Sequence, residues 1–315
     1  GIDPSEITDK FGADILRLWV ASSDYHADIR VSNDILKQLS EVYRKIRNTA
    51  RYILGNLYDF HPDTDSVSDD QLQELDRWAL ARMDQVAGEC RKAYDNFEFH
   101  LVYYAIRNFC TIDLSNFYLD IIKDRLYVEK PDSVSRRAAQ TAIYRILRDM
   151  TLVFAPILAF TCEEIWANLP QSVDHDPEAC VFNEMPKGGN SKETAEFMAK
   201  WERIRKVRDD VNKALENARN QKTIGKSLEA MVQLTADGEL YDFLKENEEM
   251  LAQVVSQVQL HQQAVAQPTG EMEGLAVAIE KAQGEKCERC WTYSDTVGQD
   301  AKHPTLCARC AAIIG

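Results

Sequence analysis

The chain has 315 residues, 45% of them hydrophobic and 28% charged, and a formal net charge of −14. This composition predicts a soluble globular chain with about two domains of roughly 150 residues each. The longest nearly apolar run, Met150 to Cys162, is shorter than the ~18 residues of a membrane span, and no leader sequence is recognisable. We therefore expect a cytoplasmic protein with no membrane partner. The net negative charge argues against a protein that coats nucleic acid non-specifically, because it would repel phosphates. It does not exclude a local basic face.

The first strong periodic segment spans residues 34–57 and predicts an amphipathic helix, because its mainly apolar positions recur every three or four residues. Four basic side chains project within about 80° of one another, nearly opposite the apolar stripe: Lys37, Arg44, Arg47 and Arg51. A solvated face is the ordinary interpretation of such a run. Here only Asp34 and Glu41 oppose five cations, counting Lys45. This imbalance favours a helix that faces phosphate groups.

Three further helices are predicted before residue 170. Ser68 and Gln71 have capping-box spacing ahead of a second helical pattern. Residues 97–128 are apolar around most of the helix circumference, which is typical of a central helix. A fourth helix runs over residues 133–169, and Pro156 should kink or break it. Short polar connectors between these segments predict a helical bundle.

A segment rich in proline, glycine, asparagine and aspartate follows Trp166 and indicates a domain boundary. The next segment is an amphipathic helix through Trp201 and Leu215 with many basic residues on its outer faces, which makes a second basic surface. Alternating apolar runs near residues 228–234, 254–260 and 275–279 predict strands, and a helical pattern separates the first two. A mainly α fold is therefore expected, with a small α+β domain after the bundle.

Two Cys-x-x-Cys pairs lie near the end of the sequence: Cys287, Cys290, Cys307 and Cys310. Two such pairs are the usual way for a short chain to enclose a tetrahedral Zn²⁺. Iron is the alternative, since four thiolates also bind it, and four unrelated cysteines would rarely show this spacing. Four cysteine ligands fill the coordination sphere of the ion and leave no position for water, so the metal should be structural and not catalytic. The other four cysteines are scattered singly, and no disulfide is expected.

Trp291 directly follows the second cysteine, and basic residues surround it in the sequence. An exposed aromatic ring in such a setting can stack on a nucleic-acid base. The alternative is that Trp291 covers the small core of the knuckle itself. Elsewhere, glycine-rich phosphate loops, nucleophile elbows and clusters of histidine with carboxylates are missing from the sequence. We therefore predict no catalytic residue in this chain, and a binding function.

Three segments together resemble the bacterial isoleucyl-tRNA synthetase family of class Ia aminoacyl-tRNA synthetases. These are "GADILRLWVASSDYHADIRVS", "YRKIRNTARYILGNL" and "FAPILAFTCEEIW". The resemblance extends over essentially the whole chain, and the four-cysteine tail separates it from the valyl and leucyl relatives. It implies that the chain follows the KMSKS loop of the family. Its sequence begins with Gly1, so we expect a fragment of a longer protein.

The resemblance implies the following function. The fragment would bind the anticodon stem and loop of tRNA(Ile) as part of a monomeric ligase. Its ATP site, aminoacylation site and editing site would lie in an upstream catalytic core of the same chain, so the fragment alone would be inactive. Arg30, in the family segment "DIRVS", would contact the anticodon loop. Lys37, Arg44, Arg47 and Arg51 would bind phosphates, Trp291 would stack on RNA, and the four cysteines of the tail match the family's zinc ligands.

The resulting division has five parts. Residues 1–30 would be a stem that follows the core, 31–169 the anticodon-binding bundle, 170–190 a linker, 191–283 the α+β junction domain and 284–315 the zinc tail. Two alternatives stay open. The first is a DNA-binding protein of the formamidopyrimidine-DNA glycosylase type, which carries a similar zinc finger. The second is a helical scaffold without an RNA role.

Overall fold

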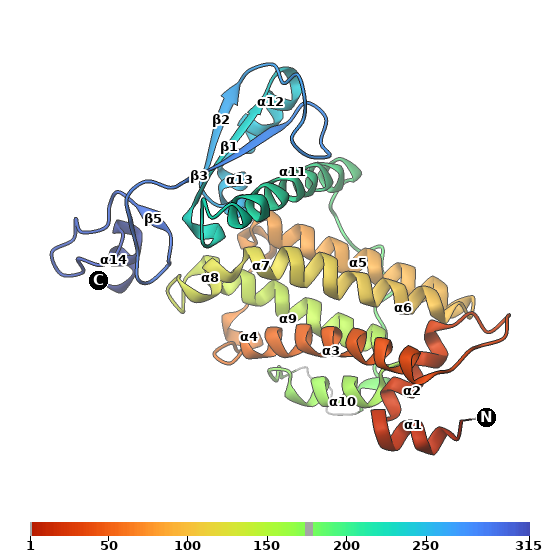
Figure 1. Ribbon diagram of the computed structural model, residues 1–315. Coiled ribbons are helices and arrows are strands. Elements are labelled where there is room, and N and C mark those ends of the chain that lie inside the picture. The colour runs from red at the N-terminus through yellow and green to blue at the C-terminus, as the bar shows by residue number, and fades with distance from the viewer. Residues whose placement is uncertain (1, 174–178) are drawn as a thin grey trace. The chain divides into compact units, whose positions relative to one another are not determined.

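The computed structural model describes residues 2–173 and 179–315. The chain forms two compact units, Gly1–Glu193 and Thr194–Gly315, which Figure 1 shows as a helical part and a smaller part with strands. Part of the predicted linker, residues 174–178, lies outside the described residues. None of the described helices is both long and apolar enough to cross a bilayer.

The first unit consists of helices, which confirms the prediction of a mainly α fold. Its elements in chain order are α1 (Pro4–Phe11), α2 (Ala13–Ser22), α3 (Asn33–Gly55), α4 (Pro62–Asp65), the 3₁₀ turn η1 (Asp69–Gln71), α5 (Glu74–Asp95), α6 (Phe99–Asn108), the π-helix η2 (Phe109–Tyr118), α7 (Leu119–Ile121), α8 (Lys123–Tyr127), α9 (Val134–Phe154), α10 (Ala159–Asn168) and the 3₁₀ turn η3 (Cys180–Phe182).

Helix α3 follows the predicted apolar period. The Ser32 side chain caps its first turn by accepting a hydrogen bond from the Ile35 N–H at 3.2 Å. Its buried side chains form one stripe, while Lys37, Arg44 and Arg51 on the other side are exposed. The packing of this stripe is what holds the basic residues on the outside of the bundle.

The predicted break at Pro156 is confirmed, because α9 ends at Phe154 and α10 begins at Ala159. Two side chains of α2 bind the polar groups that the break leaves without helical partners. Arg17 donates to the carbonyls of Pro156 and Ile157 at 2.7 and 2.9 Å. The Asp14 carboxylate accepts from the N–H groups of Phe160 and Thr161. Side chains of α2 therefore stabilise the interruption between α9 and α10.

The predicted start of the second helix at Ser68 is wrong. Ser68 and Gln71 do form a capping box, but this box closes the short turn η1. Helix α5 begins at Glu74 with a capping box of its own between Gln73 and Asp76. The spacing of Ser68 and Gln71 correctly predicted a capping box, but a 3₁₀ turn can use the same box as an α-helix. The predicted central helix is present as α6, η2, α7 and α8, with a π-helical stretch at its middle.

A buried ion pair lies between α5 and α8. The carboxylate of Asp76, which is fully buried, accepts from both terminal nitrogens of Arg125 at 2.8 Å. The Tyr118 hydroxyl also donates to it at 2.6 Å, and burial raises the pKa of that hydroxyl well above its usual value. Burial opposes the charge on Arg125, but the hydrogen bonds with Asp76 and the negative charge of that carboxylate together raise its pKa. The carboxylate therefore has a charged partner and a neutral side-chain donor.

The second unit is α+β. Its elements are α11 (Ala195–Asn220), the 3₁₀ turn η4 (Ser227–Glu229), β1 (Ala230–Ala236), α12 (Gly238–Glu246), α13 (Glu248–Val255), β2 (Val258–Gln262), β3 (Ala276–Lys281), β4 (Glu285–Lys286), β5 (Tyr293–Ser294) and α14 (Ala308–Ile314). The three-stranded sheet has the order β2-β1-β3. Strand β1 pairs parallel with β2 and antiparallel with β3, with Val232 opposite Val258 and Ile279. Alternate residues of β1 are buried, as the period-2 pattern predicts.

Two details of this unit differ from the prediction. The run over residues 254–260 is only partly a strand, because Val254 still belongs to α13 and β2 begins at Val258. Ser256, at φ +79°, makes the turn between them. The single helix expected between the first two strands is divided at Asn247 into α12 and α13. Apolar spacing alone does not separate a short helix end from a short strand.

Candidate zinc centre and nucleic-acid interface

The four cysteines of the tail converge on one point. Their sulfur atoms all lie within 4.8 Å of one another, and the sulfurs of Cys290 and Cys307 are 3.9 Å apart. A tetrahedral zinc ion with Zn–S bonds of ~2.3 Å would place its sulfur ligands about 3.8 Å apart. A disulfide would require about 2.05 Å. The donor set therefore fits a structural Zn²⁺, as predicted from the spacing.

Short backbone turns bring the two pairs together. The first pair lies in the turn of the β4–β5 hairpin, and Cys307 and Cys310 lie at the start of α14. Gly284, at φ +86°, allows the hairpin to close, because a Cβ there would lie 2.3 Å from the Ser294 backbone.

The thiols already differ in acidity. Burial opposes ionisation of Cys287, but backbone N–H groups, among them that of Cys307, outweigh it and lower its pKa to about 6. Burial raises the pKa of Cys310 to about 12, so zinc binding there would release a proton.

Arg289 lies within the same knuckle. One of its terminal nitrogens is buried and has no hydrogen-bond partner among the described residues, and its side chain lowers the pKa of Cys310, against the larger effect of burial. A zinc ion with four thiolates carries two net negative charges. The Arg289 guanidinium would partly neutralise them, which is a further reason that this cluster fits the ion.

Trp291 is half exposed, at 52% of its accessible surface. Its indole N–H donates to the Glu288 carbonyl at 3.1 Å, which fixes the ring on the knuckle. The ammonium groups of Lys226 and Lys286 lie 5.2 and 5.6 Å from the ring centre, within the range of cation–π attraction. The backbone of Trp291 is left-handed, at φ +66°, a conformation that favours glycine. The ring thus presents aromatic surface beside two cations.

The predicted phosphate contacts on α3 are not equivalent. Lys37 and Arg51 are exposed, and neither side chain has an ion-pair partner within the described part of the chain. Arg44 forms an exposed pair with Glu41 at 2.6 Å. Arg47 is half-buried and donates two hydrogen bonds of 2.8 Å to Glu164 on α10. Arg47 therefore also holds α10 against α3.

Arg30 precedes α3 and is exposed. Its carbonyl accepts a hydrogen bond from the Trp19 indole at 3.1 Å, which ties this segment to α2. Its guanidinium has no partner in residues 2–173 or 179–315. The structure thus places Arg30 and Lys37 near the same end of α3, with Arg51 about 21 Å from Lys37 by the helix rise.

The second basic surface, on α11, is largely paired within its own unit. Arg203 contacts Glu239 at 3.3 Å, and Lys213 contacts Glu271. Arg208 is buried and donates to the Val254 carbonyl at 3.0 Å. These cations stabilise the α+β fold, and fewer of them remain for an external partner.

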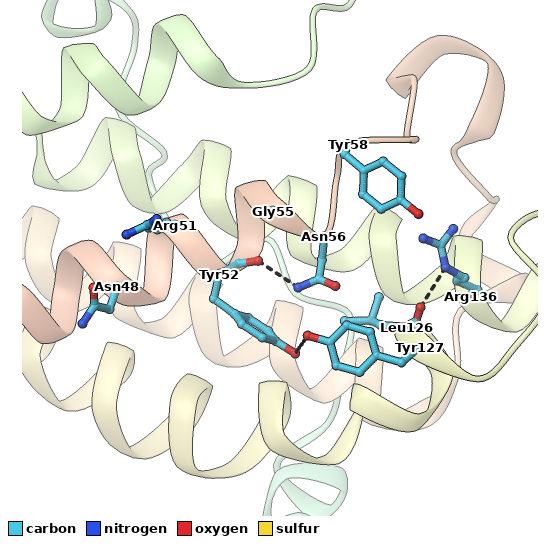
Figure 2. Close-up of a pocket in the computed structure, with 9 residues that line it drawn as sticks. All are labelled: Asn48, Arg51, Tyr52, Gly55, Asn56, Tyr58, Leu126, Tyr127 and Arg136. Carbon is cyan, nitrogen blue, oxygen red and sulfur yellow. Dashed lines mark hydrogen bonds between the residues drawn. The ribbon is translucent and has the colours of Figure 1, made fainter. Parts of the chain in front are cut away.

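Sequence reasoning missed an open groove at the C-terminal end of α3. Tyr58, Tyr127 and Arg51 are among the residues that line it, and Figure 2 shows them with the other lining residues. The two tyrosines are far apart in the sequence and belong to no motif. Tyr58 follows the end of α3 and Tyr127 is the last residue of α8, so the only available signal was an aromatic residue near the end of each helix.

Two families of known proteins match parts of the chain. The family described as the anticodon-binding domain of tRNA ligase matches residues 76–234. The family described as a zinc finger found in FPG and IleRS matches residues 284–313 and so includes all four cysteines.

Curated relatives match along the whole chain. Isoleucine–tRNA ligase of Syntrophotalea carbinolica is 50% identical over 99% of this chain and 34% of its own length. Those of Halalkalibacterium halodurans and Carboxydothermus hydrogenoformans are 49% and 48% identical with the same coverage. The chain thus spans about a third of the length of these relatives. A solved Agrobacterium radiobacter K84 LeuRS–tRNA–LeuAMS complex covers 88% of this chain and 30% of its own, with 14% identity and a TM-score of 0.44, too weak a likeness to support an argument.

Proposed function

Because the chain belongs to the family of the anticodon-binding domain of tRNA ligase, we propose that it is the tRNA-binding part of a longer isoleucine–tRNA ligase. In this proposal it binds the anticodon stem and loop of tRNA(Ile). The observation that supports this proposal is that an anticodon-binding match and a zinc-finger match follow each other in one chain. The anticodon-binding match covers residues 76–234, and the zinc finger of residues 284–313 follows it, in a chain 50% identical to the isoleucine–tRNA ligase of Syntrophotalea carbinolica.

The surface of α3 supplies a mechanism for RNA binding. Exposed Lys37, Arg44 and Arg51 would contact phosphates of the RNA along α3, since the stripe follows the helix axis. Arg30 would contact the RNA near the first turn of α3, and Arg47 would add a weaker contact because Glu164 engages it. Trp291 would stack on an unpaired base.

The rest of the proposal concerns the longer protein. Residues 1–30 would follow a catalytic core, which would bind ATP and join isoleucine to the tRNA. The finer division at residues 31–169, 170–190, 191–283 and 284–315 belongs to the same proposal. A bound Zn²⁺ would hold the tail rigid, and no step of the reaction would pass through it. The ligase would act as a monomer in the cytoplasm.

The alternative is a DNA-binding role, because the matched zinc finger also occurs in FPG proteins. Under this alternative, duplex DNA containing a damaged base would compete with tRNA at equal concentration. The anticodon-binding match over residues 76–234 favours tRNA.

The first test is the affinity of the 315-residue chain for tRNA(Ile) at several salt concentrations. Lys37→Glu is expected to weaken binding about fivefold at 0.1 M salt and to reduce the salt slope by about 1, because one phosphate contact is lost. Lys92→Glu on α5, an exposed lysine with the same change of charge, is the matched control and should have little effect. Equal affinities for both variants and the unchanged chain would contradict an α3 interface.

The second test concerns the aromatic surface of the tail. Trp291→Gly is expected to weaken tRNA binding about fivefold to 100-fold, because base stacking contributes about 1–3 kcal/mol. Glycine suits the left-handed backbone at this position, so the knuckle should keep its zinc. Trp291→Phe retains a ring and should bind nearly normally. If Trp291→Gly instead lowers thermal stability and leaves RNA affinity unchanged, the ring serves only to cover the knuckle.

A further inference from the structure

An open groove of about 630 Å³ lies where the C-terminal end of α3 meets the end of α8. Figure 2 shows Tyr58 on one side of it and the Tyr52–Tyr127 pair on the other, with Asn56 between them. The volume lies within the ~300–1,000 Å³ of small-molecule sites in proteins. The groove is therefore large enough for one nucleotide.

The rim of the groove exposes aromatic rings. Tyr58 is 80% exposed and Tyr127 is 59% exposed, although burial of such rings would stabilise the fold. The hydroxyl of Tyr127 donates to that of Tyr52 at 3.1 Å, which fixes the Tyr127 ring at the edge. Burial and this contact raise the pKa of Tyr52, so the Tyr52 hydroxyl stays neutral near pH 7. Exposed and oriented rings of this kind are what unpaired bases stack on.

Two polar side chains that line the groove are free to bind. Asn48 and Arg51 are exposed, and neither side chain has a partner within residues 2–173 and 179–315. No carboxylate is among the nine described residues that line the groove. The nearby Asp120 pairs with Lys123 at 2.9 Å. The lining thus offers a free guanidinium for phosphate and a free amide for a base edge.

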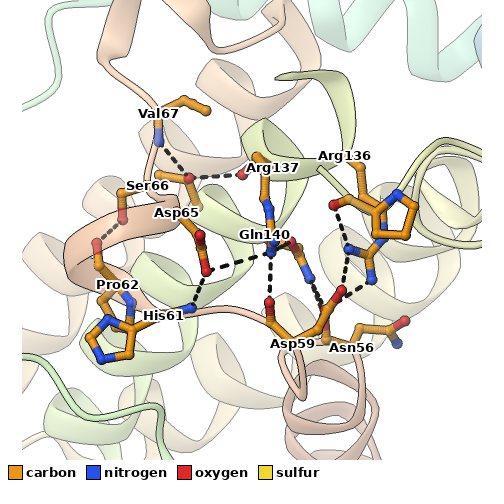
Figure 3. A network of polar contacts seen from close by, with 12 residues as sticks. Asn56, Asp59, His61, Pro62, Asp65, Ser66, Val67, Arg136, Arg137 and Gln140 are labelled. Atoms are coloured by element: carbon orange, nitrogen blue, oxygen red, sulfur yellow. Dashed lines mark hydrogen bonds and ion pairs between the residues drawn. The ribbon is translucent and has the colours of Figure 1, made fainter. Parts of the chain in front are cut away.

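The floor of the groove is rigid. The Asn56 amide donates to the Tyr52 carbonyl at 2.9 Å, and the Asn56 carbonyl accepts from Gln140 at 3.0 Å. Arg136 binds both carboxylate oxygens of Asp59 at 2.7 and 3.0 Å, and Gln140 donates to the same carboxylate, as Figure 3 shows. Burial opposes ionisation of Asp59, but these hydrogen bonds and the neighbouring arginine charges together keep its pKa below its usual value. A floor ordered in advance loses little entropy on binding.

We propose that this groove binds one unpaired nucleotide of the RNA, with its base on the rings of Tyr58 and Tyr127, its edge toward Asn48 and Asn56, and its phosphate on Arg51. The proposal rests on the proposed function, since it assumes that α3 faces RNA. Helix α3 has 23 residues and is about 34 Å long, and Arg30 precedes its other end. The groove therefore binds a different nucleotide from any that Arg30 contacts.

The experiment uses the full 315-residue chain and a stem-loop RNA with the anticodon-arm sequence of tRNA(Ile). A fluorescent 2-aminopurine replaces one unpaired loop base at a time. One position should be quenched on binding, because stacking on a tyrosine ring quenches the probe. Tyr58→Ala and Tyr127→Ala should each abolish that quenching and weaken binding about fivefold to 100-fold, while the salt slope stays unchanged. Tyr58→Phe should restore both signals. Tyr104→Ala, an exposed tyrosine of α6 outside the groove, is the control.

The outcomes separate the two proposals. If the RNA binds, and Lys37→Glu weakens it, but both tyrosine variants behave like the unchanged chain, the groove is not a base site and the proposed function stands. If no RNA binds to the unchanged chain, both proposals fail. An excess of free nucleoside monophosphate should not remove the quenching. If it does so while the RNA stays bound, the groove is a site for free nucleotides and the inference is wrong.

Discussion

Cys290→Ser is expected to release zinc and unfold residues 284–315 while the helical unit remains folded. The tail has little apolar core of its own: its buried apolar side chains other than cysteine are Leu306 and Ala311. A fold this small depends on its metal, because zinc binding and folding occur together. The unit Gly1–Glu193 has a separate core of long helices. Loss of the metal should therefore not spread to it.

The size of this effect follows from the number of ligands. Structural zinc contributes about 10–16 kcal/mol in zinc-finger peptides, so one of four thiolates accounts for roughly 2.5–4 kcal/mol. We expect zinc affinity to fall on the order of 100-fold to 1,000-fold. Zinc content after dialysis against a weak chelator measures the loss, and circular dichroism at 222 nm measures the helices.

His303→Ala is the matched control, because His303 lies in the same enclosed loop but outside the cluster of four sulfurs. This variant should hold zinc as the unchanged chain does. A large loss of helical signal in Cys290→Ser would contradict the independence of the helical unit. Retention of zinc in Cys290→Ser together with its loss in His303→Ala would contradict the four-cysteine site.

The sequence alone predicted those features whose stabilising interactions lie between residues close together in the chain. The two Cys-x-x-Cys pairs predicted the zinc cluster because each pair closes a tight turn around the ion. Pro156 predicted the break between α9 and α10 because a proline within a helix removes a backbone donor. The period of α3 predicted that Lys37, Arg44 and Arg51 are exposed. In each case the physical cause lies within a few residues of the feature.

Features that depend on distant residues could not be predicted in this way. Arg47 looked like a free cation, but its partner Glu164 lies 117 positions away. Tyr58 and Tyr127 carry no signal until the bundle brings the ends of α3 and α8 together. The buried partners of Asp76 are likewise on other elements, 42 and 49 positions away. Long-range pairing of polar groups is decided by tertiary packing, which apolar periodicity does not encode.

Asp76 supplies the second large expected effect. Asp76→Ala should lower the free energy of unfolding of the helical unit by about 3–5 kcal/mol, because it leaves the buried Arg125 without its carboxylate. The Tyr118 hydroxyl and the Gln73 N–H would also lose an acceptor, and buried donors without partners are costly. The midpoint of urea unfolding, followed by the helical signal, measures the change.

A second ion pair of the same region provides the control. Asp120 pairs with Lys123 at 2.9 Å, but both side chains are about half exposed. Asp120→Ala should therefore cost at most about 1 kcal/mol, although it too removes a carboxylate from a basic partner. The contrast between the two variants isolates burial as the cause. Equal shifts of the unfolding midpoint would mean that water reaches the Asp76–Arg125 pair. In that case apolar packing, and not the ion pair, would fix α5 against α8.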